Sequence, residues 1–190
     1  MNKPKTGVVL CALLALVLLA SAVCALHWVN AVSLRGTAKL ADYSLTDGAA
    51  ENLVPVMNEP WVEEGILHIS GALLRMNQPV GEVNVRVGLV AQQLEAGAPA
   101  RSAEEALLLN TQLVRRTGLA QEYGCDDHCG FHAAVRAKSL QTGGVQYCVV
   151  LADETDGAMR MVETGMTITL IEGGIAFARV NGPEEAQHAQ

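Results

Sequence analysis

The residues of this chain best suited to chemistry lie together in the stretch Gly124–His132, which contains two cysteines, two aspartates and two histidines. Cys125, His128, Cys129 and His132 carry the thiolate and imidazole donors that Zn²⁺ accepts in a tetrahedral site. These four side chains fall within eight residues of sequence, whereas a structural zinc site normally joins two ligand pairs that are distant in the chain. They are candidate ligands by type, but their spacing leads us to expect no metal.

A disulfide is another outcome that the cysteines allow. Of the five cysteines, Cys125, Cys129 and Cys148 lie outside the apolar N-terminal part of the chain. In an exported domain we expect one disulfide, either Cys125–Cys129 or Cys129–Cys148. Cys148 also fits a third interpretation, as a buried apolar thiol on a strand.

Catalysis and calcium binding are both disfavoured in this stretch. A Cys–His nucleophile needs an orienting third group and an oxyanion donor, and the sequence places neither. Asp126 and Asp127 lack the twelve-residue loop of oxygen ligands that calcium sites use, so a solvated turn is expected. His68 lies on an expected strand and has no partner visible in the sequence. We therefore expect no enzyme, no catalytic residue and no cofactor.

The elements that position these residues follow a long apolar run, Gly7–Leu26. The run has 20 residues and no charge, and a helix of that length spans about 30 Å, the thickness of the hydrocarbon core of a bilayer. Lys3 and Lys5 precede it, which places residues 1–6 in the cytoplasm under the positive-inside rule. We expect residues 7–28 to be a single-pass anchor in the cell membrane, with the C-terminal domain extracytoplasmic.

A cleaved secretory signal is the alternative for the same run, because Ala20 and Ala22 fit a signal-peptidase site. The run, however, is longer than the usual apolar core of about 7–15 residues in a signal peptide. It stays apolar beyond Ala22, and His27 and Trp28 then follow as residues of a membrane interface would. These features favour an anchor that is retained.

The rest of the chain is acidic and large enough for one domain. Residues 31–190 carry 11 basic and 20 acidic side chains, and such a module is repelled by nucleic acid. We expect a spacer at residues 29–60 that begins with a helical extension at Ala31–Tyr43, a β domain at residues 61–180, and a flexible tail at residues 181–190.

Apolar residues that alternate with polar ones predict short strands in this domain. The clearest case is Val83–Leu89, in which Arg86 is expected to face water. Further strands are expected at Ile66–Leu73, Phe131–Ala137, Val145–Leu151, Met159–Val162, Met166–Ile171 and Ile175–Val180. The segment Ser102–Gly118 is ambiguous, because a capping box favours a helix and its apolar residues suit a strand, Ala106–Arg115, bent near Asn110. Regularly spaced short strands predict an all-β fold, an antiparallel β-sandwich of immunoglobulin-like or jelly-roll-like type.

The half of the chain from Ala106 to Ile171 resembles accessory β-sandwich modules of bacterial cell-surface and cell-wall-polymer proteins. The resemblance is carried by Gly130-Phe131, Ser139-Leu140, the apolar strand Tyr147–Leu151 and Thr164-Gly165. It implies a fold and a location at the cell envelope, and no reaction. It also implies that Leu107–Val114 is a strand.

From these patterns we expect a non-catalytic interaction or scaffolding role at the cell envelope. The partners would be the membrane, through the N-terminal helix, and an envelope protein or a cell-wall polymer. One alternative is a module that binds glycans or wall polymers, although the domain has few aromatic rings for a sugar platform. The other alternative is a metal- or thiol-dependent activity at Cys125–His132.

Overall fold

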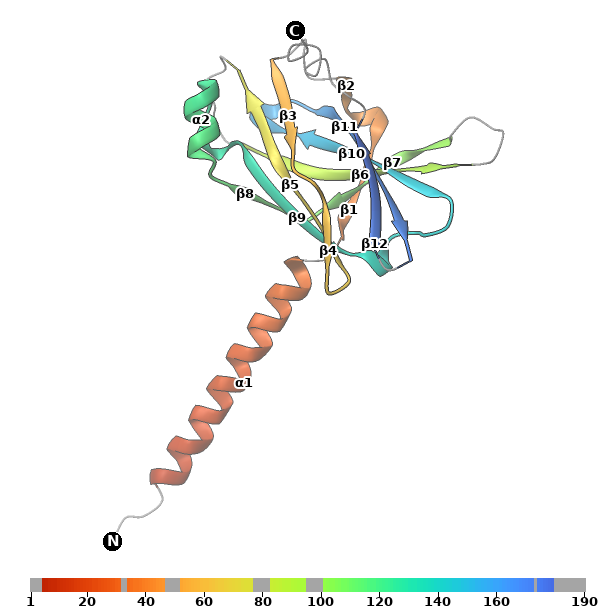
Figure 1. The fold of residues 1–190 in the computed structure, drawn as a ribbon. Helices are drawn as coiled ribbons and strands as arrows, with labels where there is room; N and C mark the ends of the chain where they lie inside the picture. Colours follow the sequence, from red (N-terminus) through yellow and green to blue (C-terminus); the bar gives the residue numbers. More distant parts are fainter. Residues whose placement is uncertain are drawn as a thin grey trace. The chain divides into compact units, whose positions relative to one another are not determined.

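The structure is a computed structural model that describes residues 5–31, 34–46, 52–76, 83–94, 101–172 and 174–179. The chain divides into two compact units, Met1–Ala31 and Val32–Gln190. The first unit contains one long helix, and the second contains strands and one short helix (Figure 1). The predicted tail at residues 181–190 lies outside the described residues.

The first unit is the helix α1, Lys5–Ala31. Its described side chains, at residues 10–26, are all exposed, and leucines such as Leu18 and Leu19 are 70% and 67% exposed. Within the residues that the structure describes, no helix meets the length and hydropathy needed to cross a membrane. The predicted transmembrane anchor is therefore not supported by this finding.

The second unit is mostly β: two antiparallel sheets packed as a sandwich. Sheet A contains β1 (Leu34–Lys39), β2 (Ser44–Thr46), β6 (Val85–Gln93), β7 (Arg101–Leu109), β10 (Val145–Asp153), β11 (Arg160–Ile171) and β12 (Gly174–Arg179). Sheet B contains β3 (Leu53–Met57), β4 (Trp61–Glu63), β5 (Ile66–Arg75), β8 (Thr111–Val114) and β9 (Gly130–Arg136). The strand order is β1-β7-β6-β10-β11-β12 in sheet A and β3-β5-β9-β8 in sheet B, with β4 paired to β5 and β2 paired in parallel to β11.

The core lies between the sheets because every second side chain of each central strand is apolar. In sheet A, Val87 of β6 and Leu151 of β10 are fully buried there. In sheet B, Leu67 and Ile69 of β5 and Phe131 of β9 face them and are equally buried. The alternation read from the sequence thus fixes the inner faces of these strands correctly.

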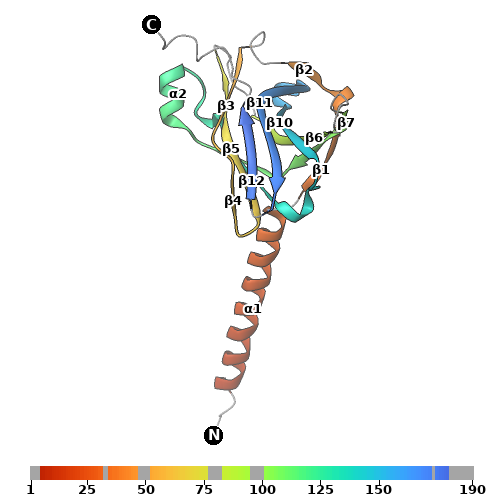
Figure 2. The ribbon, with the colours of Figure 1, turned by 45° about the vertical axis from the view of Figure 1, so that its right-hand side comes forward.

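The expected spacer at residues 29–60 is wrong, because the residues described after α1, 34–46 and 52–60, contain strands of the two sheets. Where a helical extension was expected, at Ala31–Tyr43, β1 pairs with β7, and β2 then follows and pairs with β11. Between them a short turn, η1 (Leu40–Asp42), passes over the outer face of sheet A, and we call the segment from β1 to β2 the strap (Figure 2). Leu40 and Tyr43 pack on the apolar outer face of β6, β7 and β10. Because burial of apolar surface is favourable, packing on this face stabilises the segment as strands of sheet A and not as a helix.

The two strands expected at Met159–Val162 and Met166–Ile171 are one continuous strand, β11. The Thr164-Gly165 pair, which separates the two expected strands, is a bulge where the register with β10 shifts. Gly165 has a φ of +67°, and the Thr164 hydroxyl donates to the Val149 carbonyl at 2.6 Å. A glycine with positive φ in a bulge keeps the strand paired on both sides while it bends.

The ambiguous segment is a strand, as the resemblance implied. It forms β7 and β8, which break at Asn110, so the expected bend is confirmed. This break carries the chain from sheet A to sheet B. The short helix α2, Thr117–Tyr123, follows and ends at Gly124 with a φ of +64°, the left-handed conformation common at helix ends.

Candidate functional site

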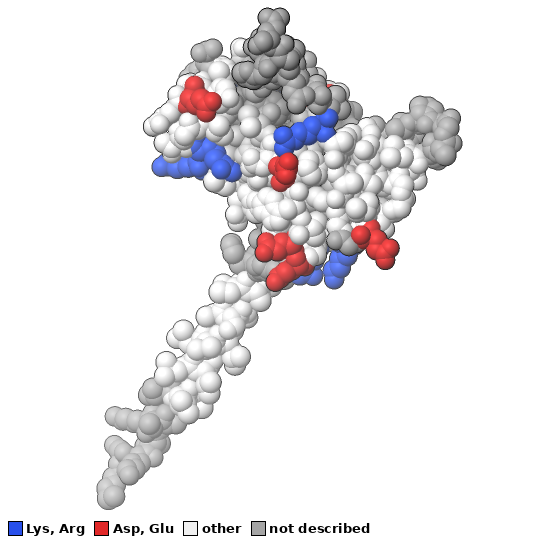
Figure 3. Space-filling model, in the orientation of Figure 1, with Lys and Arg blue, Asp and Glu red and all other residues white. Residues whose placement is uncertain are grey.

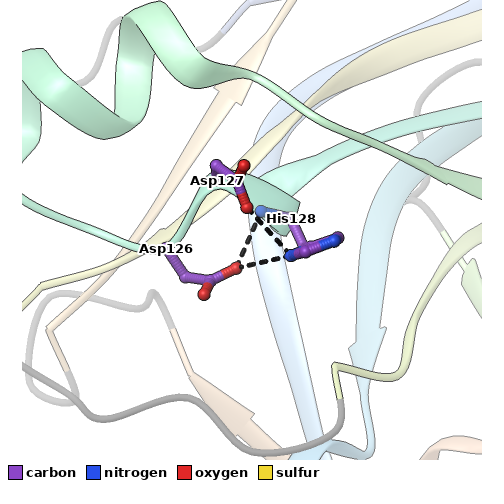
Figure 4. Close-up of side chains that lie close together, drawn as sticks. All are labelled: Asp126, Asp127 and His128. Carbon is purple, nitrogen blue, oxygen red and sulfur yellow. Dashed lines mark hydrogen bonds and ion pairs between the residues drawn. The ribbon is translucent and has the colours of Figure 1, made fainter.

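The stretch Gly124–His132 does not form one site, because the structure sends its side chains in different directions. Asp126, Asp127 and His128 form a hydrogen-bonded group at the turn η3 (Asp127–Cys129), as Figure 4 shows. Cys125 and Cys129 pack beneath α2. His132 lies on β9 and contacts a histidine of β5.

The Asp126–Asp127–His128 group has geometry that could hold a cation, but its imidazole is already engaged (Figure 4). His128 Nδ1 lies 3.2 Å from an Asp126 carboxylate oxygen and 2.9 Å from one of Asp127. On the other side of the ring, Arg115 Nε donates to His128 Nε2 at 3.1 Å. The Asp126 carboxylate also accepts the backbone N–H of His128 at 2.7 Å. The group is therefore a polar turn in which Arg115 binds the ring of His128. This agrees with the solvated turn expected at Asp126 and Asp127.

Cys125 and Cys129 lie side by side in one apolar cluster. They pack against Ala72 and Leu74 on the outer face of sheet B and against Leu119 of α2. Burial, and after it the neighbouring Cys125 thiol, raises the pKa of Cys129 to about 11. A thiol with a raised pKa stays protonated at neutral pH, which makes it a weak nucleophile and a weak metal ligand.

Cys148 lies in a different part of the molecule. It pairs with Val90 and Thr167 in sheet A and packs with the apolar cluster on the outer face of that sheet. Burial, followed by the charge of Glu163, raises the pKa of its thiol. Packed sheets stand about 10 Å apart, and a disulfide needs Cα atoms within about 7 Å. A Cys129–Cys148 disulfide is therefore excluded, whereas Cys125–Cys129 stays a prediction.

An aromatic ladder crosses the outer face of sheet B and consists of Trp61, His68 and His132. Trp61 lies directly opposite His68 in the β4–β5 pairing, and their rings stack with centroids 4.8 Å apart and planes at 8°. The His68 and His132 rings stack in turn with centroids 5.4 Å apart. His68 Nδ1 lies 3.2 Å from His132 Nε2. Trp61 is 41% exposed and both imidazoles are half-buried, so this ladder is open to solvent.

The electrostatics of the ladder favour the neutral form of His132. Burial, and after it the positive charge that His68 would carry, lowers the pKa of His132 below its ordinary value of 6.5. Two adjacent imidazoles that share one proton can hydrogen-bond only while at least one of them is neutral. Trp61 stacks on His68 and also approaches the ring of His132, at 6.0 Å between centroids.

The ladder was missed in the sequence, where His68 appeared to lack a partner and His132 was grouped with the cysteines. His68 and His132 are 64 residues apart and meet as diagonal neighbours, because Ser70 is paired with His132 and His68 with Ala134. The alternation of β5 and β9 places both on outer faces of strands. Which strands are neighbours, and in what register, is not encoded in that pattern.

A second polar cluster links the strap to the end of β10. The Tyr43 hydroxyl donates to Glu154 at 2.6 Å, and Arg86 and Asn84 donate to the other oxygen of this carboxylate at 2.9 Å and 3.0 Å. Burial, and then the hydrogen bond to Glu154, raises the pKa of Tyr43 to about 12. Arg86 therefore binds a carboxylate instead of simply facing water. Asp153, the last residue of β10, is fully buried.

No family model, curated protein or solved structure matches this chain. The resemblance to envelope-associated β-sandwich modules is therefore not supported by any of these comparisons.

Proposed function

We propose that this protein is a non-catalytic binding module held at a cell membrane by α1, with its β-sandwich on the extracytoplasmic side. The observation that carries the proposal is the apolar, exposed surface of α1, which is a separate unit of the chain. In Figure 3 the described part of α1 carries no charged side chain. A helix that is apolar on all sides is stable only where something apolar surrounds it, and lipid is the commonest such medium.

The sequence supplies the length that lipid requires. The uncharged run Gly7–Leu26 has 20 residues, three more than the stretch 10–26 whose side chains the structure describes. Lys3 and Lys5 before the run favour an N-terminus in the cytoplasm. The exported side also suits the paired thiols of Cys125 and Cys129.

The ladder of Trp61, His68 and His132 is the surface we assign to ligand contact. On the face of the domain seen in Figure 3, charged residues of both signs are scattered in small groups. Such a surface gives no strong electrostatic attraction to a polyanion. Exposed aromatic rings held rigidly by neighbouring strands are, in contrast, typical contact residues of binding sites.

A non-catalytic role agrees with the state of the reactive groups. The pKa values of Cys129 and Cys148 are raised by burial, the opposite of what activates a nucleophile. His132 is partnered by another histidine and not by a hydroxyl or a thiol that it could deprotonate. The proposed function is therefore interaction with an envelope component.

The membrane proposal is tested by extraction of the full chain expressed in a bacterium. We expect the wild-type chain to stay in the membrane pellet after washing at alkaline pH, and to keep its first 30 residues by mass spectrometry. Leu14→Arg with Leu18→Arg should release the chain, because each arginine costs about 2.5–3.5 kcal/mol at the centre of a spanning helix. Leu45→Arg, a change at an exposed apolar residue of β2, is the matched control and should not. A wild-type chain that is soluble, or that has been cleaved, contradicts the proposal.

Glycan or wall-polymer binding is the second candidate, favoured by the exposed ring of Trp61. A ligand that binds only the folded state raises the melting temperature, so soluble wall fragments should shift the thermal transition of the wild-type chain. Trp61→Ala should abolish that shift, and Trp28→Phe, at the other tryptophan, should preserve it. If no fragment raises the melting temperature, glycan binding is contradicted and the ligand is a protein partner.

A further inference from the structure

Two nitrogen atoms of the ladder stand at the separation of neighbouring ligands on a single metal ion. His68 Nδ1 lies 3.2 Å from His132 Nε2. Imidazole nitrogens bind zinc at about 2.0–2.1 Å. At that bond length two ligands are about 2.9 Å apart in a square-planar site and about 3.4 Å apart in a tetrahedral one. The observed separation falls between these values, so one ion can replace the proton that the two rings now share.

The sheet holds this pair in place before any ion arrives. His68 is paired with Ala134, and Ser70 with His132, within an unbroken seven-pair register between β5 and β9. Trp61 stacks on His68 at 4.8 Å and limits the positions of its ring. The small adjustment that an ion requires can come from the His132 ring, because χ2 of histidine is broad. A preformed pair binds an ion at a lower entropic cost than two mobile side chains would.

We propose that His68 and His132 together bind one divalent late transition-metal ion, with Cu²⁺, Ni²⁺ and Zn²⁺ as the chemical class. Neutral imidazole suits these ions, and Cu²⁺ binds most tightly among them. Within the described part of the chain, no third histidine, cysteine, aspartate or glutamate joins this pair in a metal-binding group. Water therefore fills the other coordination positions, which makes the site open and exchangeable, unlike a closed structural zinc site.

The rival location for an ion is the Asp126–Asp127–His128 group. There the imidazole already accepts a hydrogen bond from Arg115, and the same carboxylates face the ring from the other side. An ion would have to enter beside a guanidinium that stays charged at all relevant pH values. In the His68–His132 pair, the two rings contact each other and the ring of Trp61. The two locations are separated by single substitutions.

The experiment uses the full chain in detergent, with Trp28→Phe as background so that Trp61 is the sole tryptophan. Titration with NiCl₂ should quench the fluorescence of Trp61 in a saturable manner, and native mass spectrometry should show one nickel ion per chain. His68→Gln and His132→Gln should each raise the dissociation constant at least about tenfold. The matched control, His128→Gln, should leave it unchanged.

A second measurement on the chain with both histidines guards against variants that fail to fold. The electron paramagnetic resonance spectrum of the chain loaded with less than one equivalent of Cu²⁺ should show hyperfine coupling to two imidazole nitrogens. A dissociation constant that changes only with His128→Gln, or a spectrum with a single imidazole, overturns the proposal. The test needs neither a glycan nor a membrane partner, so its outcome is independent of the proposed function.

Discussion

Arg75 at the end of β5 donates to Asp153 at the end of β10 across 2.6 Å, and the two side chains are 4% and 0% exposed. This contact ties sheet B to sheet A. Arg160 of β11 binds the second carboxylate oxygen at 2.8 Å, and the Thr155 hydroxyl accepts from Arg75 at 2.9 Å. The sandwich is thus closed at this point by buried charge instead of apolar packing.

Asp153→Asn should destabilise the domain by about 3–5 kcal/mol, because it removes the negative charge that faces the buried guanidinium of Arg75. Urea unfolding followed by circular dichroism measures the change. Glu104→Gln, at an exposed residue of β7, should alter stability by no more than about 0.5 kcal/mol. Equal effects of the two substitutions would mean that the buried contact contributes little.

The stability of the domain should depend on pH in two separate ranges. Burial alone would raise the pKa of Asp153, but the hydrogen bond with Thr155 and the charge of Arg75 outweigh it and hold this pKa below the ordinary 3.8. The contribution of ionised Asp153 to the free energy of unfolding is complete above pH 3.8. It is lost as the pH falls through the lowered pKa that Asp153 has in the folded state. The pKa of His132 is lowered from 6.5, so its contribution is complete above pH 6.5 and declines as the pH falls below it.

Urea midpoints measured between neutral and acidic pH check both contributions. His132→Gln should reduce the loss of stability that begins below pH 6.5 and keep the loss that begins below pH 3.8. Asp153→Asn should reduce the loss below pH 3.8 and keep the loss below pH 6.5. Unchanged profiles in both variants would assign the pH dependence to other groups.

Gly71→Ala should destabilise the domain by about 3 kcal/mol, because overpacking a filled core carries a cost of this size. A Cβ at Gly71 would collide with the carbonyl oxygen of Val56 and lie 2.8 Å from Phe131 Cζ. Gly118→Ala is the matched control, since a Cβ there meets nothing within 4 Å. Within helix α2 it should stabilise the domain by about 0.4–1 kcal/mol. Thermal unfolding of both variants compares them, and a neutral Gly71→Ala would contradict the packing described.

Cys125 and Cys129 should form a disulfide when the domain is exported. The two thiols lose two protons and two electrons to the oxidant of that compartment, and the closed loop stabilises the fold by about 2 kcal/mol. Mass spectrometry after alkylation should show two fewer modified cysteines than in the reduced chain. Cys125→Ser should restore alkylation at Cys129, whereas Cys148→Ser should leave the disulfide intact. A bond that disappears in Cys148→Ser would contradict the arrangement of the cysteines.

The fold class could be predicted because the alternation that defines the inner face of a strand is local. Val85, Val87 and Leu89 pointed to the core before any partner strand was known, and the structure places them there. The strap could not be predicted, because its pairing partners in β7 lie about seventy residues later in the chain. Residues that gain stability only from such distant contacts carry no local signal, so a helical extension was the local preference.

In the candidate site, too, local features could be predicted from the sequence, and features that depend on distant strands could not. Asp126, Asp127 and His128 are sequence neighbours, and their turn was expected. The pairing of His68 with His132 depends on which strand lies beside β5, and the position of Trp61 depends on the hairpin that pairs β4 with β5. Sequence showed which side chains point outward, and only the register showed which of them meet.

The strap has a mechanical consequence, because β1 begins at Leu34, three residues after α1 ends at Ala31. Any force that travels along the chain from a fixed α1 enters the domain at the first residue of β1. The pairs from Leu34 to Lys39 with β7 are then loaded before any other part of the sandwich. Pulled from this point, the protein would yield first by peeling the strap from the outer face of sheet A, while the strands that carry the ladder stay paired. If α1 is held in a membrane, as proposed, the strap is the first part of the domain that carries such a force.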